Sequence, residues 1–433
     1  MKKYSNEEIE AFRQRAHLRI PAGAHTYSKA DEQFSSNTPA FIQKGNGALC
    51  YDYKGDEYID YGMGIFSVSL GHAYPNVIEA ISRRLKNGNS FTRPTLLEGE
   101  LAEQLCSIIP SAEMVKFAKN GSDVTSAAIR LARAYTGRDV VVTMKEQPFH
   151  SFNDWFIGST SKPGGVPFNI REQTLKIPYN NIHAFEQVIH NYTDKIACVL
   201  MEPMTFESPV DGYLEKIREI CSKHGIVLVF DEIITGFRWD LQGAQHYFNV
   251  IPDLSTFGKG MANGFACAAL VGKKEIMKLG DFSNNVFLLS CTYGAELVGL
   301  TAARETISLF QKSPVIEHIW SYGKELMNGL STQIKTLNLD DHVRMAGYAC
   351  RPDISFYDSQ GNYSFVLKTL FVQEMVKHHI LMERICISYS HNKELLDRTL
   401  NASEQAFIVL RQALKSGNVM EYIKGAIIKP VFT

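Results

Sequence analysis

The chain has 433 residues, of which 45 are basic and 46 acidic, so its formal net charge is -1. This balance gives no reason to expect nucleic acid or an anionic membrane as a partner. Hydrophobic residues make up 45% of the chain and charged residues 21%, which is typical of a globular protein, and the length predicts two lobes.

The cysteines and the ends of the chain favour an ordinary cytoplasmic protein. Eight cysteines are scattered without a C-x-x-C pair or zinc-ligand spacing, so we expect free thiols and no metal site. Two lysines open the chain, but no apolar stretch follows them as in a signal peptide. No run approaches the roughly 18–20 apolar residues of a membrane span.

The sequence of the first 75 residues predicts a helix followed by short strands. Ser5 followed by Glu8 is a capping box, which predicts a helix through about Leu18. Strands are expected at 47–52 and 57–60, joined by a turn at 54–56. This segment precedes the main alternating pattern, so we expect it to join the C-terminal lobe.

From about residue 76 to 330, helical stretches alternate with short apolar runs. The runs are continuously apolar, as expected of strands buried on both faces of a mostly parallel sheet. They lie at 139–143, 197–201, 226–230 and 266–272. The last hundred residues predict helices with β pieces at 353–357 and 385–389. We therefore predict an α/β fold with a large domain at 76–310 and a smaller α+β domain built from 1–75 and 311–433.

The strand at 226–230 runs directly into the acidic pair Asp231 and Glu232. Ligands of open α/β sheets bind beyond the carboxyl ends of strands, so Asp231 is placed to face a crevice and to pair with a protonated ring nitrogen. An ordinary capping or surface acid fits this motif equally well.

Lys259 lies between Gly258 and Gly260, after a further apolar run. Glycines let the backbone turn tightly and approach a ligand, and a crowded lysine forms imines with carbonyl groups. A solvated surface lysine is the simpler interpretation of this motif alone.

A third motif opens a strong helix with small polar residues, Asn120, Gly121 and Ser122. The free N–H groups and dipole at such a helix start suit a phosphate, although an ordinary helix cap has the same residues. No Walker A or G-x-G-x-x-G pattern occurs. Together, the anion site, Asp231 and Lys259 supply what a phosphorylated pyridine aldehyde needs for its phosphate, ring nitrogen and carbonyl carbon.

The order of these motifs resembles the class III aminotransferases, which are pyridoxal-phosphate enzymes of fold type I, and in particular the branch around glutamate-1-semialdehyde 2,1-aminomutase. The resemblance covers nearly the whole chain. It is carried by Ile20–His25, Tyr58–Tyr61, Leu70–Pro75, Asn120–Ser122, Arg130–Arg138, Glu202–Pro203, Phe230–Arg238, Pro252–Lys259 and Leu396–Leu400.

The resemblance implies roles for the cofactor site. Lys259 would carry pyridoxal 5'-phosphate as a Schiff base and move a proton, and Asp231 would pair with the pyridine nitrogen. Ile233 and Phe149 would pack on the two faces of the ring, with His150 following Phe149, while Gly121 and Ser122 would hold the phosphate. Thr292 would reach the phosphate of the other subunit, which implies a homodimer with composite active sites.

Departures from the branch concern the substrate. Where the aminomutase uses an arginine for the substrate carboxylate, this chain has Lys29, near Tyr27. A lysine loses the two-bond carboxylate clamp, so we expect Lys29 and Tyr27 to face a sugar-like acceptor, with Arg351 or Arg384 as candidates for the carboxylate of the amino donor.

Four functions are compatible with these motifs. The first is amino transfer from a donor such as glutamate to an aldehyde or ketone. The second is an aminomutase, and the third is a decarboxylase or racemase, since one cofactor chemistry serves many reactions. The fourth is a binding scaffold without activity, which the intact pair of Lys259 and Asp231 argues against.

Overall fold

A computed structural model describes residues 3–432. Its centre is a seven-stranded sheet with the order β4-β10-β9-β8-β7-β5-β6. Strands β9, β8, β7, β5 and β6 are parallel, whereas β10 runs antiparallel to both of its neighbours. The strands are β4 (Met114–Ala118), β5 (Val140–Met144), β6 (Thr174–Ile177), β7 (Ile196–Met201), β8 (Val227–Asp231), β9 (Leu254–Phe257) and β10 (Ala268–Gly272).

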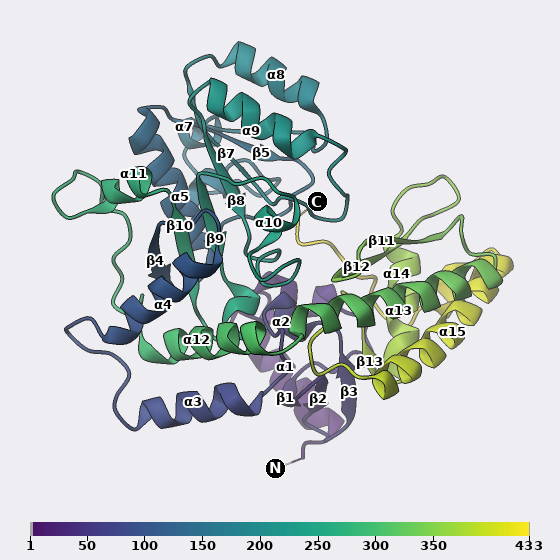
Figure 1. Ribbon diagram of the computed structural model, residues 1–433. Helices are drawn as coiled ribbons and strands as arrows, with labels where there is room; N and C mark the ends of the chain where they lie inside the picture. The colour runs from purple at the N-terminus through teal and green to yellow at the C-terminus, as the bar shows by residue number, and fades with distance from the viewer. Residues whose placement is uncertain (1–2, 433) are drawn as a thin grey trace.

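Helices cover both faces of this sheet, which confirms the predicted α/β class (Figure 1). Alternate residues of β8 enter different cores: Val227 and Val229 pack in one with helix α5, and Leu228 and Phe230 pack in the other with α8 and α9. The strands are therefore apolar throughout because neither face meets water. The helices of this part are α3 (Pro75–Leu85), α4 (Leu96–Ile108), α5 (Gly121–Thr136), α6 (Asp154–Ile157), α7 (Phe168–Arg171), α8 (Ile182–Asn191), α9 (Tyr213–Lys223), α10 (Ala244–Tyr247), α11 (Lys274–Met277) and α12 (Leu297–Lys312).

A second sheet joins the two ends of the chain. Its order is β1-β2-β3-β13, and β3 pairs in parallel with β13. Figure 1 shows α13, α14 and α15 gathered beside the hairpin of β11 and β12, away from α8 and α9. These elements are α1 (Asn6–His17), β1 (Ile42–Asn46), β2 (Leu49–Asp52), β3 (Glu57–Asp60), α2 (Met63–Phe66), α13 (Val315–Thr336), β11 (Val343–Tyr348), β12 (Arg351–Phe356), α14 (Phe365–Lys377), β13 (Ile380–Leu381) and α15 (Lys393–Ser416). The limits 1–75, 76–310 and 311–433 stay a prediction.

Local predictions can be compared with these elements. The capping box of Ser5 and Glu8 is present at the start of α1. The strand expected at 385–389 is wrong, because these residues make single backbone hydrogen bonds without forming a ladder. Cys386 N–H donates to the Tyr61 carbonyl at 2.8 Å, and Tyr389 N–H donates to the Ser69 carbonyl at 2.8 Å. The C-terminal strand of the second sheet is instead the two-residue β13.

Candidate active site

Lys259 lies where β9 ends, at the start of a 3-10 helix, Lys259–Ala262. Its backbone φ of 42° is in the left-handed region, which residues other than glycine rarely adopt. Burial lowers the pKa of Lys259 to about 8, while the negative charges of Glu202 and Asp231 act to raise it. A larger share of this amine is therefore neutral near pH 8 than in a solvated lysine, and only the neutral amine attacks a carbonyl carbon.

Asp231 is the last residue of β8, the strand beside β9, and it is buried. Its Oδ2 lies 2.7 Å from Nδ1 of His150. Its Oδ1 accepts from the Thr256 hydroxyl at 3.3 Å and from the Ile233 N–H at 3.2 Å. These contacts fix the carboxylate at the carboxyl end of the parallel strands, where ligands of such sheets bind.

His150 is fixed in turn by its own neighbours. The Thr125 hydroxyl donates to its carbonyl oxygen at 2.9 Å, and the ring lies edge-on to Phe156 with 5.5 Å between centroids. Its second ring nitrogen, Nε2, is buried and has no hydrogen-bond partner in residues 3–432. The imidazole therefore contacts Asp231 through Nδ1, and the carbonyl group of His150 is hydrogen-bonded to Thr125 of α5.

The start of α5 is the predicted anion site. Asn120 caps the helix by accepting from the Asp123 N–H, so the helix begins at Gly121. Ser122 is buried, and its hydroxyl oxygen accepts from the Phe152 N–H at 3.1 Å, which leaves the hydroxyl hydrogen available to a ligand. The N–H groups of a first helical turn have no acceptor within the helix and favour negative charge.

Ile233 connects the three predicted motifs. A Cβ built at Gly121 would lie 3.2 Å from Ile233 Cδ1, and one built at Gly258 would lie 3.1 Å from the same atom. A methyl group at either position would be tighter than an ordinary contact, so Ile233 would have to shift by a few tenths of an ångström. The result is a cradle formed by Gly121, Ile233 and Gly258.

Sequence reasoning gave no role to Glu202, which directly follows β7, and only a candidate role to Arg351, the first residue of β12. Both are buried, and Arg351 Nη1 lies 3.8 Å from Glu202 Oε2. Within the described residues, Glu202 Oε2 and the Nε and Nη1 atoms of Arg351 have no hydrogen-bond partner. Burial raises the pKa of Glu202, against the positive charge of Arg351. The guanidinium lies 5.4 Å from the centre of the Phe66 ring and 4.8 Å from that of Phe206.

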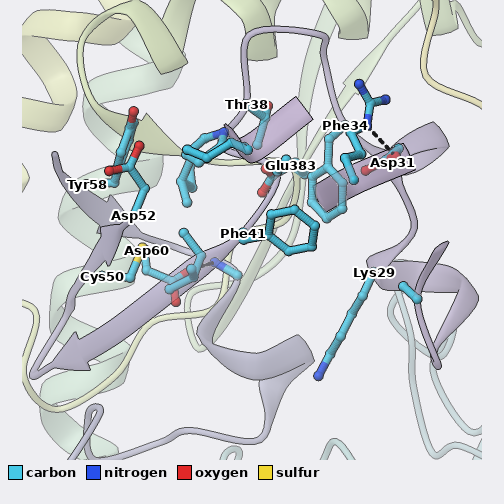
Figure 2. Close-up of a pocket in the computed structure, with 18 of the residues that line it drawn as sticks. Lys29, Asp31, Phe34, Thr38, Phe41, Cys50, Asp52, Tyr58, Asp60 and Glu383 are labelled. Carbon is cyan, nitrogen blue, oxygen red and sulfur yellow. Dashed lines mark hydrogen bonds and ion pairs between the residues drawn. The ribbon is translucent and has the colours of Figure 1, made fainter. Parts of the chain in front are cut away.

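Other predicted site residues lie at the surface of this chain. Phe149 is 48% exposed and meets Phe156 edge-on at 5.9 Å. Tyr27 and Lys29 belong to the exposed N-terminal segment, and Lys29 lines a cavity of about 1090 Å³ whose lining residues do not include Lys259 or Asp231 (Figure 2). Thr292 is exposed in the segment before α12.

The segment that carries Thr292 is anchored beside the anion site. Lys119, the residue before the α5 cap, forms an ion pair with Glu296 and donates to the Ala266 carbonyl at 2.8 Å. Glu296 caps α12 by accepting from the N–H groups of Val298 and Gly299. The usual N-cap residues are Ser, Thr, Asp and Asn, and glutamate is not among them, so no clear sequence signal marks this cap.

Two features of residues 3–432 bear on other classes of function. These residues contain no helix that is both long and apolar enough to cross a membrane. They also contain no group of three or more His, Cys, Asp or Glu side chains arranged to hold a metal ion. All eight cysteines are free thiols.

Comparison with known proteins agrees with this geometry. Residues 31–398 match the family described as Aminotransferase class-III. The chain is 35% identical over 396 residues to glutamate-1-semialdehyde 2,1-aminomutase of Methanothermobacter thermautotrophicus, covering 86% of this chain and 93% of that protein.

Solved structures have the same fold. The FumI protein of Sphingopyxis sp. MTA144, solved in its pyridoxal-phosphate internal aldimine form, is 25% identical with a TM-score of 0.87, covering 95% of this chain and 98% of that one. A glutamate-1-semialdehyde aminomutase of Pseudomonas aeruginosa PAO1 is 19% identical with a TM-score of 0.82, covering 93% and 95%.

The chain belongs to the class III aminotransferase family. Its fold is that of the fold-type I transferases, and it is an enzyme that depends on pyridoxal 5'-phosphate. The residues present fit this cofactor: the cradle at Gly121 and Ile233, the buried carboxylate of Asp231 and the amine of Lys259 offer partners of the required chemistry.

Proposed function

We propose that this enzyme transfers an amino group from an amino-acid donor such as glutamate to an aldehyde or ketone acceptor of sugar-like character. The observation that carries the proposal is the buried, incompletely paired Arg351 beside Glu202, because both residues interact electrostatically with Lys259. An amino acid whose amino group is to replace Lys259 on the cofactor needs a cation nearby for its carboxylate. Arg351 supplies one with unused donors.

The cofactor contacts are proposed residue by residue. The first turn of α5, at Gly121 and Ser122, would hold the phosphate through N–H groups and a hydroxyl. Ile233 would pack under the ring, and Phe149 would cover its other face. Thr292 of a second copy would complete the phosphate site.

When bound, pyridoxal phosphate supplies an aldehyde for the amino group and a ring that accepts the electron pair left at the substrate carbon. Asp231, held by His150 and Thr256, would keep a proton on the ring nitrogen. Lys259 Nζ, once displaced by the donor amine, would take a proton from the substrate carbon and deliver it to the carbon that came from the cofactor aldehyde. The lowered pKa of Lys259 suits this task, because a general base works best with a pKa near the working pH.

Arg351 would hold the donor carboxylate through a two-bond contact, which a guanidinium makes and an ammonium does not. When no donor carboxylate is bound, Glu202 would act as the counter-ion of the Arg351 guanidinium, at the 3.8 Å separation seen here. Phe66 and Phe206 keep water from the guanidinium, which strengthens its attraction for an anion.

The acceptor is proposed from two polar residues of the N-terminal segment, Tyr27 and Lys29. Lys29 and Tyr27 offer an ammonium and a phenol on an exposed segment, which suit hydroxyl groups as single-bond partners. Residues 20–35 contain no arginine that could clamp a second carboxylate. A polyhydroxylated aldehyde or ketone fits these donors better than glutamate-1-semialdehyde does.

An aminomutase is the second candidate, because the aminomutase of Methanothermobacter thermautotrophicus is 35% identical over most of the chain. Two assays separate the alternatives. Holoenzyme mixed with L-glutamate alone should lose the absorbance of the lysine-bound cofactor and release 2-oxoglutarate, and a sugar aldehyde should restore the band. Formation of 5-aminolevulinate from glutamate-1-semialdehyde without any donor would overturn the transaminase proposal, and carbon dioxide release from the donor would identify a decarboxylase.

A homodimer is supported by apolar surface next to Thr292. Phe282 is fully exposed, Phe287 is 75% exposed and Tyr293 is 65% exposed, all in the segment before α12. Side chains of this size are usually covered by a partner when they gather in one segment. Sedimentation should give twice the mass of the chain, and a fully active monomer would contradict the composite site. Because the cysteines are free thiols, we also propose the cytoplasm as the location.

A further inference from the structure

Arg238 is a buried cation at the end of the turn that follows β8. The residue is only 2% exposed. Glu232 accepts from the Thr235 hydroxyl at 2.7 Å, and the Thr235 carbonyl accepts from the Arg238 N–H at 3.2 Å. The turn therefore starts at the strand end that carries Asp231, and its own hydrogen bonds fix where Arg238 lies.

The guanidinium of Arg238 reaches the backbone beside Arg351. Its Nη1 donates to the Cys350 carbonyl at 3.1 Å and to the Ile387 carbonyl at 3.2 Å. Cys350 directly precedes Arg351, the first residue of β12. Arg238 thus holds the backbone from which the Arg351 side chain extends, and it links that backbone to the turn after β8.

No carboxylate compensates the charge of Arg238. Among residues 3–432, no Asp or Glu oxygen lies within 4.0 Å of its nitrogens. The contacts of its Nη2 are the neutral Ser69 hydroxyl at 3.4 Å and Cys386 Sγ at 3.3 Å. A buried cation without a counter-ion is costly, so an anion bound nearby would offset part of that cost.

Arg238 and Arg351 lie beside the same aromatic ring. The guanidinium carbon of Arg238 is 5.7 Å from the centre of the Phe66 ring, and that of Arg351 is 5.4 Å from it. Burial raises the pKa of the Cys386 thiol. The positive charges of Arg238, Lys259 and Arg351 oppose that rise, so all three act on one point of the structure. Like charges gathered in this way attract an anion.

We propose that Arg238 is a positioning residue for the carboxylate of the amino donor, a role that rests on the proposed function of Arg351. Arg238 holds the start of β12 through the Cys350 carbonyl, and its charge adds to the attraction that Arg351 exerts on an anion. Donors that carry a carboxylate therefore depend on Arg238, whereas primary amines without a carboxylate do not.

Two variants of the holoenzyme test this role by steady-state kinetics. Arg238→Met removes both the charge and the donors, and Arg238→Lys keeps the charge but loses the planar fork. We expect the KM for L-glutamate to rise about 10-fold in Arg238→Met and about threefold in Arg238→Lys. The kcat/KM for a primary amine without a carboxylate should change less than about twofold in both. The lysine variant keeps the test decisive if the methionine variant does not fold. Equal losses for both donors, or an unchanged KM for L-glutamate, would overturn the proposal.

Arg138→Gln is the matched control. Arg138 likewise donates to a backbone carbonyl, that of His224, at 2.9 Å. It precedes β5, whereas Asp231 ends the parallel strand β8, so the two lie at opposite ends of the sheet. Both donors should keep the parent KM in this variant. A loss specific to L-glutamate, as large as in the Arg238 variants, would show that the effect does not come from the position of Arg238 and would overturn the proposal.

Hydrogen exchange separates a failure of this proposal from a failure of the proposed function. Arg238→Lys should speed amide exchange in residues 349–356 and leave β7 unchanged, and unchanged exchange in both would reject the positioning role. Arg351→Lys tests the donor site by itself. If it spares L-glutamate, the proposed role of Arg351 fails. If it impairs L-glutamate while the Arg238 variants do not, only the positioning role fails.

Discussion

His150 Nδ1 lies 2.7 Å from Asp231 Oδ2, and both side chains are buried. The Thr256 hydroxyl and the Ile233 N–H both donate hydrogen bonds to the other carboxylate oxygen, Oδ1. Asp231 is therefore fixed in place while keeping its charge close to the crevice beyond β8, as a partner for a pyridinium nitrogen requires.

Replacement of Asp231 by asparagine should preserve the fold and slow the chemistry. An amide cannot stabilise the protonated ring, and a hydrogen bond to a charged group contributes about 1.5–3 kcal/mol, which corresponds to roughly 10- to 150-fold in rate. Single-turnover conversion with L-glutamate measures this loss. An unchanged rate, with cofactor content equal to that of the parent, would make Asp231 a structural cap.

Gly121→Ala should weaken cofactor binding because the new methyl group would lie 3.2 Å from Ile233 Cδ1. We expect about a 10-fold rise in the Kd for pyridoxal phosphate, measured by fluorescence titration of the apoenzyme. Ile233→Val removes the Cδ1 atom, so the double variant should bind better than the sum of the single effects predicts. Strictly additive effects would show that Ile233 is not in contact with this helix start.

The reaction of apoenzyme with pyridoxal phosphate should depend on the pKa of Lys259, which is about 8. Burial favours the neutral amine, so the capture rate should rise with pH and level off above about pH 8. Stopped-flow absorbance gives this profile. Arg351 contributes to lowering the pKa of Lys259, and Arg351→Met should move the midpoint to higher pH. A midpoint near 10.5 in the parent would contradict a buried Lys259.

Arg351→Lys should impair amino-acid donors selectively. The ammonium loses the two-bond clamp, so the KM for L-glutamate should rise about 10-fold or more. The matched measurement uses a primary amine without a carboxylate as the donor, and its kcat/KM should change less than about twofold. Equal losses for both donors would remove Arg351 from the carboxylate site.

The sequence predicted the parts of the site that are local in the chain. Asp231 and Lys259 follow apolar strands, and Asn120 precedes a regular helix, so the periodicity places each at an element end. The alternation of helical stretches with apolar runs likewise predicted a sheet covered by helices on both faces. The pairing of Arg351 with Glu202 depends on how the C-terminal lobe packs against β7, which no local pattern encodes.

The same limit applies to the small lobe. Residues 385–389 have strand-like composition but meet the 61–69 segment through isolated hydrogen bonds, so propensity alone predicts a strand that does not form. Glu383 Oε1 has no hydrogen-bond partner in residues 3–432, and Glu383 lines a cavity together with the N-terminal segment, which no local pattern predicts.

The identity of the cofactor-bearing lysine is the central claim, and borohydride reduction of the holoenzyme tests it most directly. Reduction fixes the cofactor to the amine that carries it, and peptide mass spectrometry then locates the modified residue. We predict a phosphopyridoxyl group on Lys259, and none in a Lys259→Ala variant that still binds the cofactor. Modification of another lysine in the parent, such as Lys29 or Lys119, or full turnover by the variant, would contradict the account.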